Sequence, residues 1–278
     1  MPLPTALYRP FHSTVGAVPT VLYSAADHIG VITLNRPEAR NAVNTEMAHA
    51  IEAAVDRIED DPDVWVGVLC ANTEGQDRPV FCAGADLKVV RETGGAGALD
   101  TERGGFGGFA YRERTKPIVV AVDGLATAGG CELVLAADVV VASTRASFGL
   151  AEVTRNLIAA AGGLFRLPRA IGRAAAMDMI LTGEPLAARR AHELGLVSRL
   201  VEPGAADAEA LRVALRIAAS APLAVRASRQ IVLRAATDDD ATLRTDSRAL
   251  LDELMTTEDA EEGLAAFAEK RPPEWKAR

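Results

Sequence analysis

Three runs of aliphatic residues constrain the fold of this chain more than any other feature of its sequence. They are VWVGVLC (64–70), the apolar part of TKPIVVAVDG (115–124) and DVVVAS (138–143). None alternates apolar with polar residues, and such continuous runs are typical of strands buried on both faces of a parallel sheet. Helical patterns separate them along the chain. Strands and helices therefore alternate between residues 20 and 200, which predicts an α/β architecture with a largely parallel sheet.

The start of this region predicts a hairpin followed by a helix. TVLYSA (20–25) and IGVITLN (29–35) are rich in β-branched residues and flank a short turn. From Asn44 onward, apolar residues recur at the spacing of one helix face, and Asn44 or Thr45 can cap that helix. These apolar residues are Met47, Ile51, Val55 and Ile58.

We expect three parts along the chain. Residues 1–19 contain prolines and polar residues and predict a loosely ordered arm. Residues 20–205 carry the strand–helix alternation and form the α/β core. Residues 206–278 contain no candidate strand, so a C-terminal helical region is expected there.

Composition excludes several classes of function. The net charge is −8 with a pI near 5.2, which argues against nucleic acid as a partner because phosphate binding needs a basic surface. No apolar run approaches the roughly 18 residues of a membrane span, and the N-terminus does not resemble a secretory signal. The three cysteines of the chain lack metal-binding spacing, and we expect them to be reduced, buried thiols. We expect a cytoplasmic protein without a membrane partner.

The segment 91–114 is the one low-complexity stretch, with seven glycines between residues 94 and 108. It does not match a phosphate-binding loop, since no GK[ST] follows and no GxGxxG connects a strand to a helix. Two interpretations remain open for it. It is either a mobile surface loop or a wall or lid over a bound ligand.

Two turns that contain glycine each follow a buried strand and precede a helix. They are FCAGAD (81–86) and ATAGG (126–130), and we expect ATAGGCELVLAA (126–137) to be helical. The first N–H groups of a helix lack intrahelical acceptors, and the helix dipole adds positive potential there. Two such N–H groups aimed at one point would form an oxyanion hole.

Two glutamates lie near these turns. Glu132 follows the second turn within an otherwise apolar stretch, and Glu152 follows the next strand. A buried carboxylate needs a partner or takes up a proton. Two carboxylates around one water can divide the roles of acid and base, because mutual repulsion keeps one of them protonated. The alternative for each glutamate is a structural salt bridge to an arginine such as Arg155 or Arg166.

Seven segments, in order from about residue 20 to the C-terminus, resemble motifs of the enoyl-CoA hydratase (crotonase) superfamily. The segments are NRPEARNAV, FCAGADLK, IVVAVDGLATAGGCELVLAADVVVAS, FGLAEV, AAGGLFRLPRAIG, AMDMILTGEPLAARRAHELGLVSRLVEP and EGLAAFAEKRPPEWK. The resemblance implies a spiral of ββα units with a C-terminal helical trimerisation region. It also implies a homotrimer or homohexamer that acts in fatty acid metabolism.

The resemblance also implies a site and a reaction. Water would add to a trans-2-enoyl-CoA to give a 3-hydroxyacyl-CoA, with no cofactor, because coenzyme A is part of the acyl-CoA substrate. Glu132 is implied as base and Glu152 as acid, although coupled carboxylates leave this division open. The implied oxyanion donors are the backbone N–H groups of Ala85 and Gly129. The implied CoA-binding residues are Lys88, Lys270, Ala83 and Asp86.

The chain departs from the family pattern at four positions near these motifs. Ala128, Ala151 and Ala160 stand where glycine, proline and glycine are usual, and Asn156 replaces a common glycine. These departures leave the acyl group open. Three alternatives to a hydratase remain: an enoyl-CoA delta-isomerase, a carnitinyl-CoA dehydratase-like enzyme, and a non-catalytic binding protein of the same fold.

Overall fold

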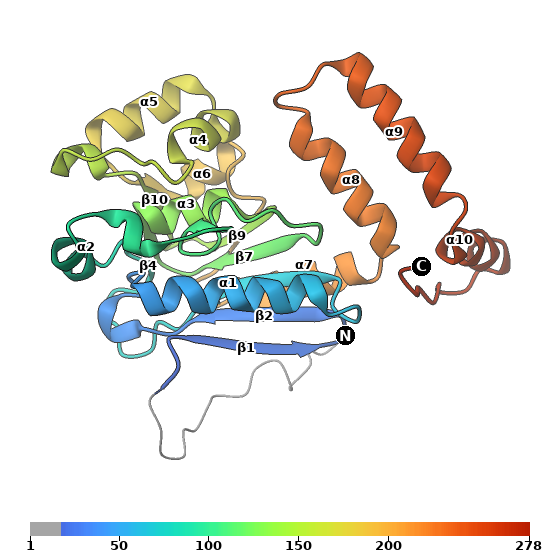
Figure 1. Cartoon of the computed structure of the whole chain (residues 1–278), viewed down its shortest axis with the longest axis horizontal. Coiled ribbons are helices and arrows are strands. Elements are labelled where there is room, and N and C mark those ends of the chain that lie inside the picture. The colour runs from blue at the N-terminus through green and yellow to red at the C-terminus, as the bar shows by residue number, and fades with distance from the viewer. Residues whose placement is uncertain (1–17) are drawn as a thin grey trace.

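The computed structural model describes residues 18–278, so the arm predicted for residues 1–19 falls almost wholly outside the described residues. A six-stranded sheet with the order β1-β2-β3-β7-β9-β12 forms the centre of the fold (Figure 1). Every neighbouring pair is parallel except the β1–β2 hairpin. The strands are Val21–Ala26, Ile29–Leu34, Val66–Ala71, Ile118–Val122, Val139–Ser143 and Arg199–Val201. The predicted α/β architecture with a largely parallel sheet is confirmed.

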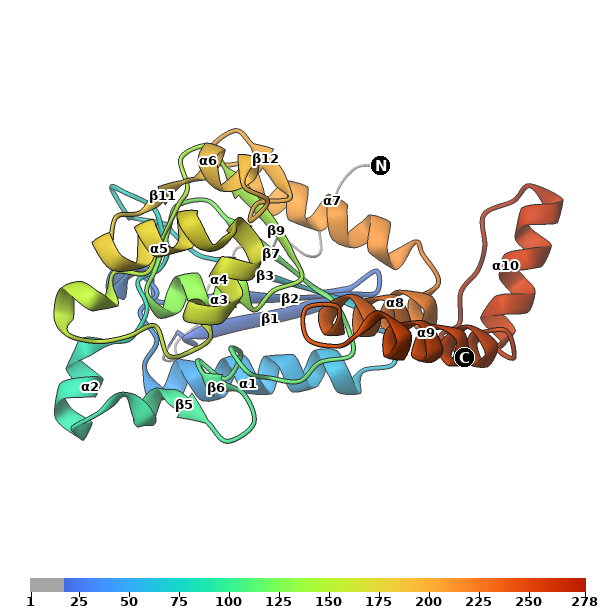
Figure 2. The same ribbon diagram turned by 90° about the horizontal axis from the view of Figure 1, so that it is seen from above.

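Helices cover both faces of this sheet (Figure 2). On one face lies α1 (Thr45–Asp60), whose predicted apolar stripe packs into the larger core cluster. The side chain of Asn44 caps α1 by accepting a hydrogen bond from the Met47 N–H at 2.9 Å. On the other face lies α7 (Ala206–Ala218), which packs its small side chains against a second core cluster. Burial on both faces explains the continuous apolar strands.

A second, smaller sheet stands beside the first, in the order β11-β10-β8-β4. Its strands are Leu186–Ala187, Ser147–Gly149, Leu125–Thr127 and Val80–Cys82. Strands β10, β8 and β4 are parallel, and β11 is antiparallel to β10. The sequence did not predict β8, and the helix expected from Ala126 begins instead at Gly129.

Short helices follow these strands. They are α2 (Leu87–Thr93), α3 (Gly129–Leu135), α4 (Gly163–Ile171), α5 (Arg173–Thr182) and α6 (Ala188–Glu193). Among them, α3 and α6 pack on the second sheet. The chain ends in α8 (Pro222–Arg234), α9 (Asp240–Leu254) and α10 (Glu258–Glu269). In both views α10 lies away from the two sheets, whereas α8 is tied to the core by an ion pair between Arg229 and Asp138 at 2.8 Å. No strand occurs after Val201 in the described chain, as the sequence predicts.

The three cysteines are free and buried, as expected. None of the helices found between residues 18 and 278 has the length and apolar character needed to span a bilayer.

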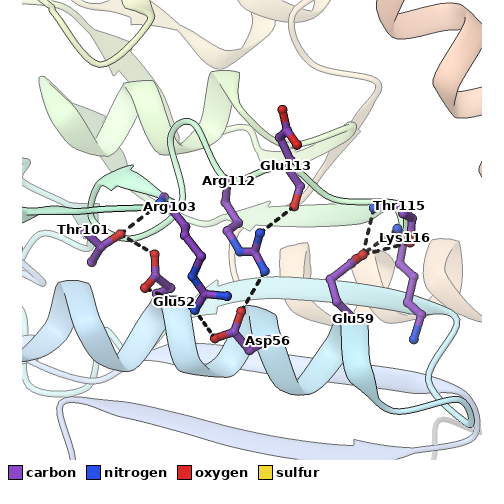
Figure 3. A network of polar contacts seen from close by, with 10 residues as sticks. Glu52, Asp56, Glu59, Thr101, Arg103, Arg112, Glu113, Thr115 and Lys116 are labelled. Atoms are coloured by element: carbon purple, nitrogen blue, oxygen red, sulfur yellow. Dashed lines mark hydrogen bonds and ion pairs between the residues drawn. The ribbon is translucent and has the colours of Figure 1, made fainter.

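The glycine-rich segment is fixed to α1 by a network of polar contacts (Figure 3). Asp56 accepts from Arg103 at 2.6 Å and from Arg112 at 2.8 Å. The Thr101 hydroxyl donates to Glu52 at 2.5 Å. The backbone approaches the helix so closely that a Cβ at Gly108 would lie 2.2 Å from a carbonyl oxygen of α1. Residues 101–112 of the segment are therefore anchored to α1.

Replacing Asp56 by asparagine should loosen this anchor. Asp56 is partly exposed and holds two arginines, so we expect a loss of about 1 kcal/mol in the free energy of unfolding. Hydrogen exchange of the amides between residues 100 and 113 should become faster. Asp60→Asn changes an exposed carboxylate on the same helix and serves as the control. Equal protection of the segment in both variants would contradict the role of Asp56.

Candidate active site

The site lies where three neighbouring parallel strands end. Strands β4, β8 and β10 have their carboxyl ends at the same edge of the second sheet. The turn after β4 carries Ala85, the turn after β8 leads into Gly129 and Glu132 on α3, and β10 is followed by Glu152. Parallel strands commonly gather functional residues at their carboxyl ends. The structure thus collects four sequence-predicted site residues at one edge.

Two backbone N–H groups at this edge lack an acceptor within residues 18–278. The Val43 N–H donates to the Gly84 carbonyl and the Asp86 N–H donates to the Val43 carbonyl. This isolated bridge turns the N–H of Ala85, between them, to the opposite side. The N–H of Gly129 opens α3 and likewise has no acceptor in this part of the chain. Both groups are available to a bound oxygen.

Small residues let the two turns approach each other. A Cβ at Gly84 would lie 2.9 Å from the Gly129 nitrogen, and Gly84 has a φ of +87°, which favours glycine. A Cβ at Gly130 would lie 2.2 Å from the Cys82 carbonyl oxygen, and one at Gly129 would lie 2.3 Å from the Phe106 ring. Phe106 belongs to the glycine-rich segment, which therefore forms a wall beside Gly129.

Ala128 holds a strained backbone between β8 and α3. Its φ of 51° and ψ of −129° lie in a region that residues with a side chain rarely adopt. Its N–H donates to the Gly149 carbonyl, and its carbonyl accepts from Cys131 and Glu132. These bonds join the β10 end to the start of α3 and so fix the orientation of Glu132 relative to the strand that precedes Glu152.

Glu132 is only 4% exposed and is held by the loop before α4. Its Oε1 accepts a hydrogen bond from the Gly163 N–H at 2.9 Å, and the nearby Ala161 N–H favours the ionised carboxylate. Gly163 is the first residue of α4, so the helix N-terminus faces the carboxylate. These N–H groups could not be predicted from the local sequence. The adjacent glycines Gly162 and Gly163 were the signal available, because the φ of +108° at Gly162 is one that favours glycine.

Burial raises the pKa of Glu132 to about 7. The Gly163 and Ala161 N–H groups and the charge of Arg166 oppose this rise, whereas the neighbouring carboxylate of Glu152 adds to it. A group with such a pKa exchanges its proton near neutral pH, which suits a general base or acid.

Glu152 opens a short 3₁₀ turn and is half-buried. Burial raises its pKa as well, and the charge of Arg155 partly offsets the effect. Its Oε2 is buried without a hydrogen-bond partner in the described residues. Neither glutamate forms an ion pair there, so the structural salt bridges to Arg155 or Arg166 that the sequence left open do not form.

The structure separates the residues expected to bind CoA. Lys88 lies on α2 and is exposed, and Ala83 is half-buried in the first turn. The Asp86 carboxylate caps α2 and accepts from Arg36 at 3.1 Å. Lys270 follows α10, and both views place α10 and α2 at opposite ends of the molecule. Lys88 and Lys270 of one chain are therefore not brought together.

Comparisons with known proteins agree with this arrangement. The enoyl-CoA hydratase/isomerase family model matches residues 24–278. A probable enoyl-CoA hydratase of Mycobacterium bovis is 36% identical over 259 residues, covering 93% of this chain and 98% of that protein. The (E)-benzylidenesuccinyl-CoA hydratase of Thauera aromatica is 39% identical, with 91% and 97% covered. The crystal structure of an enoyl-CoA hydratase from Mycobacterium tuberculosis superposes with a TM-score of 0.87 at 42% identity, covering 94% of this chain and 100% of that one.

The fold and the similarity to solved enoyl-CoA hydratases define a crotonase-type protein. The chain belongs to the enoyl-CoA hydratase/isomerase family. The family and the crotonase fold that the sequence motifs implied are thereby confirmed.

Proposed function

We propose that this protein is an enoyl-CoA hydratase, a hydro-lyase that reversibly adds water to a trans-2-enoyl-CoA in fatty acid metabolism. One observation carries the proposal: two carboxylates and two backbone N–H groups without acceptors in the described chain gather at the ends of β4, β8 and β10. The hydratases similar to this chain support the same reaction class.

In the proposed reaction the N–H groups of Ala85 and Gly129 donate to the thioester oxygen. Negative charge develops on that oxygen as water attacks the β-carbon, and these donors stabilise it. One carboxylate takes a proton from the water, and the other carboxyl group protonates the α-carbon. The oxygen and one hydrogen of water are then on the β-carbon, and the α-carbon carries one new hydrogen.

We assign Glu132 as the base and Glu152 as the acid. This is the division that the family resemblance implies. The Gly163 and Ala161 N–H groups and Arg166 favour the ionised form of Glu132, although burial outweighs them and raises its pKa to about 7. For Glu152, its own backbone N–H and Arg155 favour the ionised form, and burial again raises the pKa. Because the two carboxyl groups interact, their protons are lost in steps that belong to the pair.

We further propose that the acyl-CoA binds between copies of the chain, without an additional cofactor. Lys88 would contact the CoA portion from one copy, with Ala83 and Asp86 beside it, and Lys270 would come from a neighbouring copy in a homotrimer or homohexamer. Exposed apolar side chains on the C-terminal helices support such contacts. They are Val232, Leu233, Leu251, Met255, Leu264 and Phe267. The cytoplasmic location stays a prediction.

Turnover of a panel of enoyl-CoA thioesters tests the proposed reaction. Short, long, branched and ring-bearing trans-2-enoyl-CoAs are mixed with the enzyme in heavy-oxygen water. We expect loss of the enoyl-thioester absorbance for at least one of them, and a 3-hydroxyacyl product that carries the heavy oxygen.

Adding a 3-enoyl-CoA and a carnitinyl-type thioester to the same assay separates the alternatives. A 3-enoyl-CoA converted to a 2-enoyl-CoA without solvent oxygen in any product would indicate an isomerase and contradict the hydratase. Activity confined to carnitinyl-type substrates would indicate a carnitinyl-CoA dehydratase-like enzyme. Binding of acyl-CoA without turnover of any member of the panel would indicate a non-catalytic protein.

A further inference from the structure

The loop 160–163 determines how the Glu132 carboxylate is held. The Gly163 N–H donates to that carboxylate at 2.9 Å, and the Ala161 N–H lies near enough to favour its ionised form. Residues 160–162 form a turn, and Gly163 is the first residue of α4. A displacement of this loop would therefore lengthen the Gly163 hydrogen bond and move the Ala161 N–H away from Glu132 at the same time. What fixes the loop also fixes the carboxylate.

Tyr111 attaches this loop to the glycine-rich segment. Its hydroxyl donates to the Ala160 carbonyl at 2.6 Å, across 49 positions of sequence. The Tyr111 N–H donates to the Gly104 carbonyl at 2.8 Å, and its ring lies so close to Gly105 that a Cβ there would be 2.6 Å from a ring carbon. Because the network with α1 anchors this segment, the phenol is a fixed point for the loop.

Arg166 contacts the same loop from α4. Its Nη1 donates to the Ala161 carbonyl at 3.3 Å, and its guanidinium carbon lies 5.3 Å from the centre of the Tyr111 ring. A Cβ at Gly162 would lie 2.4 Å from Nη1, so the arginine packs directly on the glycine of the loop. Tyr111 and Arg166 thus contact residues 160–162 of the loop, and the Arg166 guanidinium lies over the Tyr111 ring.

We propose that Tyr111 and Arg166 are positioning residues that hold the loop 160–163 and thereby align the Glu132 carboxylate for proton transfer. The proposal rests on the proposed hydratase function. Neither residue needs to touch the substrate in this role. Tyr111 acts through the Ala160 carbonyl, and Arg166 acts through the Ala161 carbonyl and through its charge.

The charges around Glu132 give the expected direction of the effect. Arg166 on α4 favours the ionised form, and Glu152 beside β10 disfavours it. Tyr111 lies on the glycine-rich segment, and Cys131 precedes Glu132 on α3; burial raises the pKa of both, which keeps them neutral near pH 7. Weaker N–H bonds from the loop, or loss of the Arg166 charge, should therefore raise the pKa of Glu132.

Three substitutions test the proposal. Tyr111→Phe removes only the hydroxyl, Arg166→Met removes charge and donors, and Arg166→Lys keeps the charge. We expect Tyr111→Phe to lower kcat about 3- to 10-fold, the effect of one hydrogen bond, with KM little changed. The lower-pH limb of the kcat profile should move to higher pH in Tyr111→Phe and Arg166→Met. Arg166→Lys should restore the limb toward that of the wild type.

Tyr23→Phe and Arg169→Met are the matched controls. The Tyr23 hydroxyl has no partner in the described part of the chain, and Arg169 lies over the Phe165 ring on α4. Both should leave kcat and the pH limb unchanged. A kcat and pH limb in Tyr111→Phe equal to those of the wild type would overturn the proposal. So would a loss in Arg166→Met that Arg166→Lys does not reverse.

A second readout separates this inference from the proposed function. The ionisation of Glu132 can be followed by 13C NMR of the labelled side-chain carboxyl carbon, with Glu132→Gln used to assign the signal. The midpoint should rise in Tyr111→Phe whether or not any enoyl-CoA is turned over. A wild type without hydratase turnover would contradict the proposed function alone. An unchanged midpoint would contradict the positioning role.

Discussion

Replacing Glu132 by glutamine is expected to lower kcat for hydration by about 10²- to 10⁴-fold, the usual contribution of a general acid or base. Glutamine has nearly the same shape and can still accept the Gly163 N–H bond, so the loop 160–163 should keep its position. Only the ability to take a proton from water is lost. Glu152→Gln should cause a loss of similar size for the complementary proton transfer. Initial rates of enoyl-thioester disappearance measure both.

Two further variants make this result specific. Glu184→Gln changes an exposed glutamate on the same molecule and should leave the rate unchanged. The double variant of Glu132 and Glu152 should be scarcely slower than either single variant, because residues that act as a unit have non-additive effects. Wild-type rates in both single variants, with intact circular dichroism, would exclude the two-glutamate mechanism.

The sequence predicts the elements whose signal is local. The hairpin over residues 20–35 and the buried strands can be predicted from composition and periodicity. Within each of these strands, consecutive residues lie in the same buried surroundings, and this leaves a continuous apolar or β-branched pattern in the sequence. The helix after Asn44 also follows from local chemistry, because its cap bonds to a residue three positions away. Such features need no knowledge of the rest of the chain.

The elements that the sequence failed to predict depend on contacts far along the chain. Strand β8 has only three residues, too few for a periodic pattern, and it exists because β4 and β10 pair with its two edges. The helix was predicted to begin at Ala126, whereas α3 begins at Gly129, because residues 125–127 form β8. The fixed conformation of the glycine-rich segment likewise depends on α1, which lies about fifty residues earlier.

The sequence singled out Ala85, Gly129, Glu132 and Glu152, which the structure brings to one sheet edge, but it did not predict the groups around them. Gly129 and Glu132 could be singled out because a carboxylate in an apolar stretch after paired glycines is unusual. The groups that hold Glu132 lie elsewhere: Gly163 is 31 residues away, and Tyr111 reaches Ala160 across 49. Such partners leave no trace in local spacing. The sequence allows an ion pair between Arg166 and Glu132, yet in the structure Arg166 donates to the Ala161 carbonyl in the loop that holds Glu132.

The raised pKa of Glu132 also predicts that the site costs stability at neutral and higher pH. Its pKa is about 7 in the folded protein against an ordinary value of 4.5. Below pH 4.5 the group is protonated in both states. Between pH 4.5 and 7 the unfolded chain gives up the proton while the folded protein keeps it, so the free energy of unfolding falls as pH rises. The fall amounts to about 3 kcal/mol and is complete above pH 7.

Glu132→Gln should remove this dependence. We therefore expect the variant to gain about 3 kcal/mol in unfolding free energy, relative to the wild type, when both are moved from pH 4.5 to pH 8. Urea unfolding at a series of pH values measures the difference, with Glu184→Gln as the control that should follow the wild type. A difference between variant and wild type that does not change with pH would mean that the folded protein does not hold a proton on Glu132. Together with a loss of turnover in the same variant, the gain would show that one buried carboxylate both limits stability and carries the proton transfer.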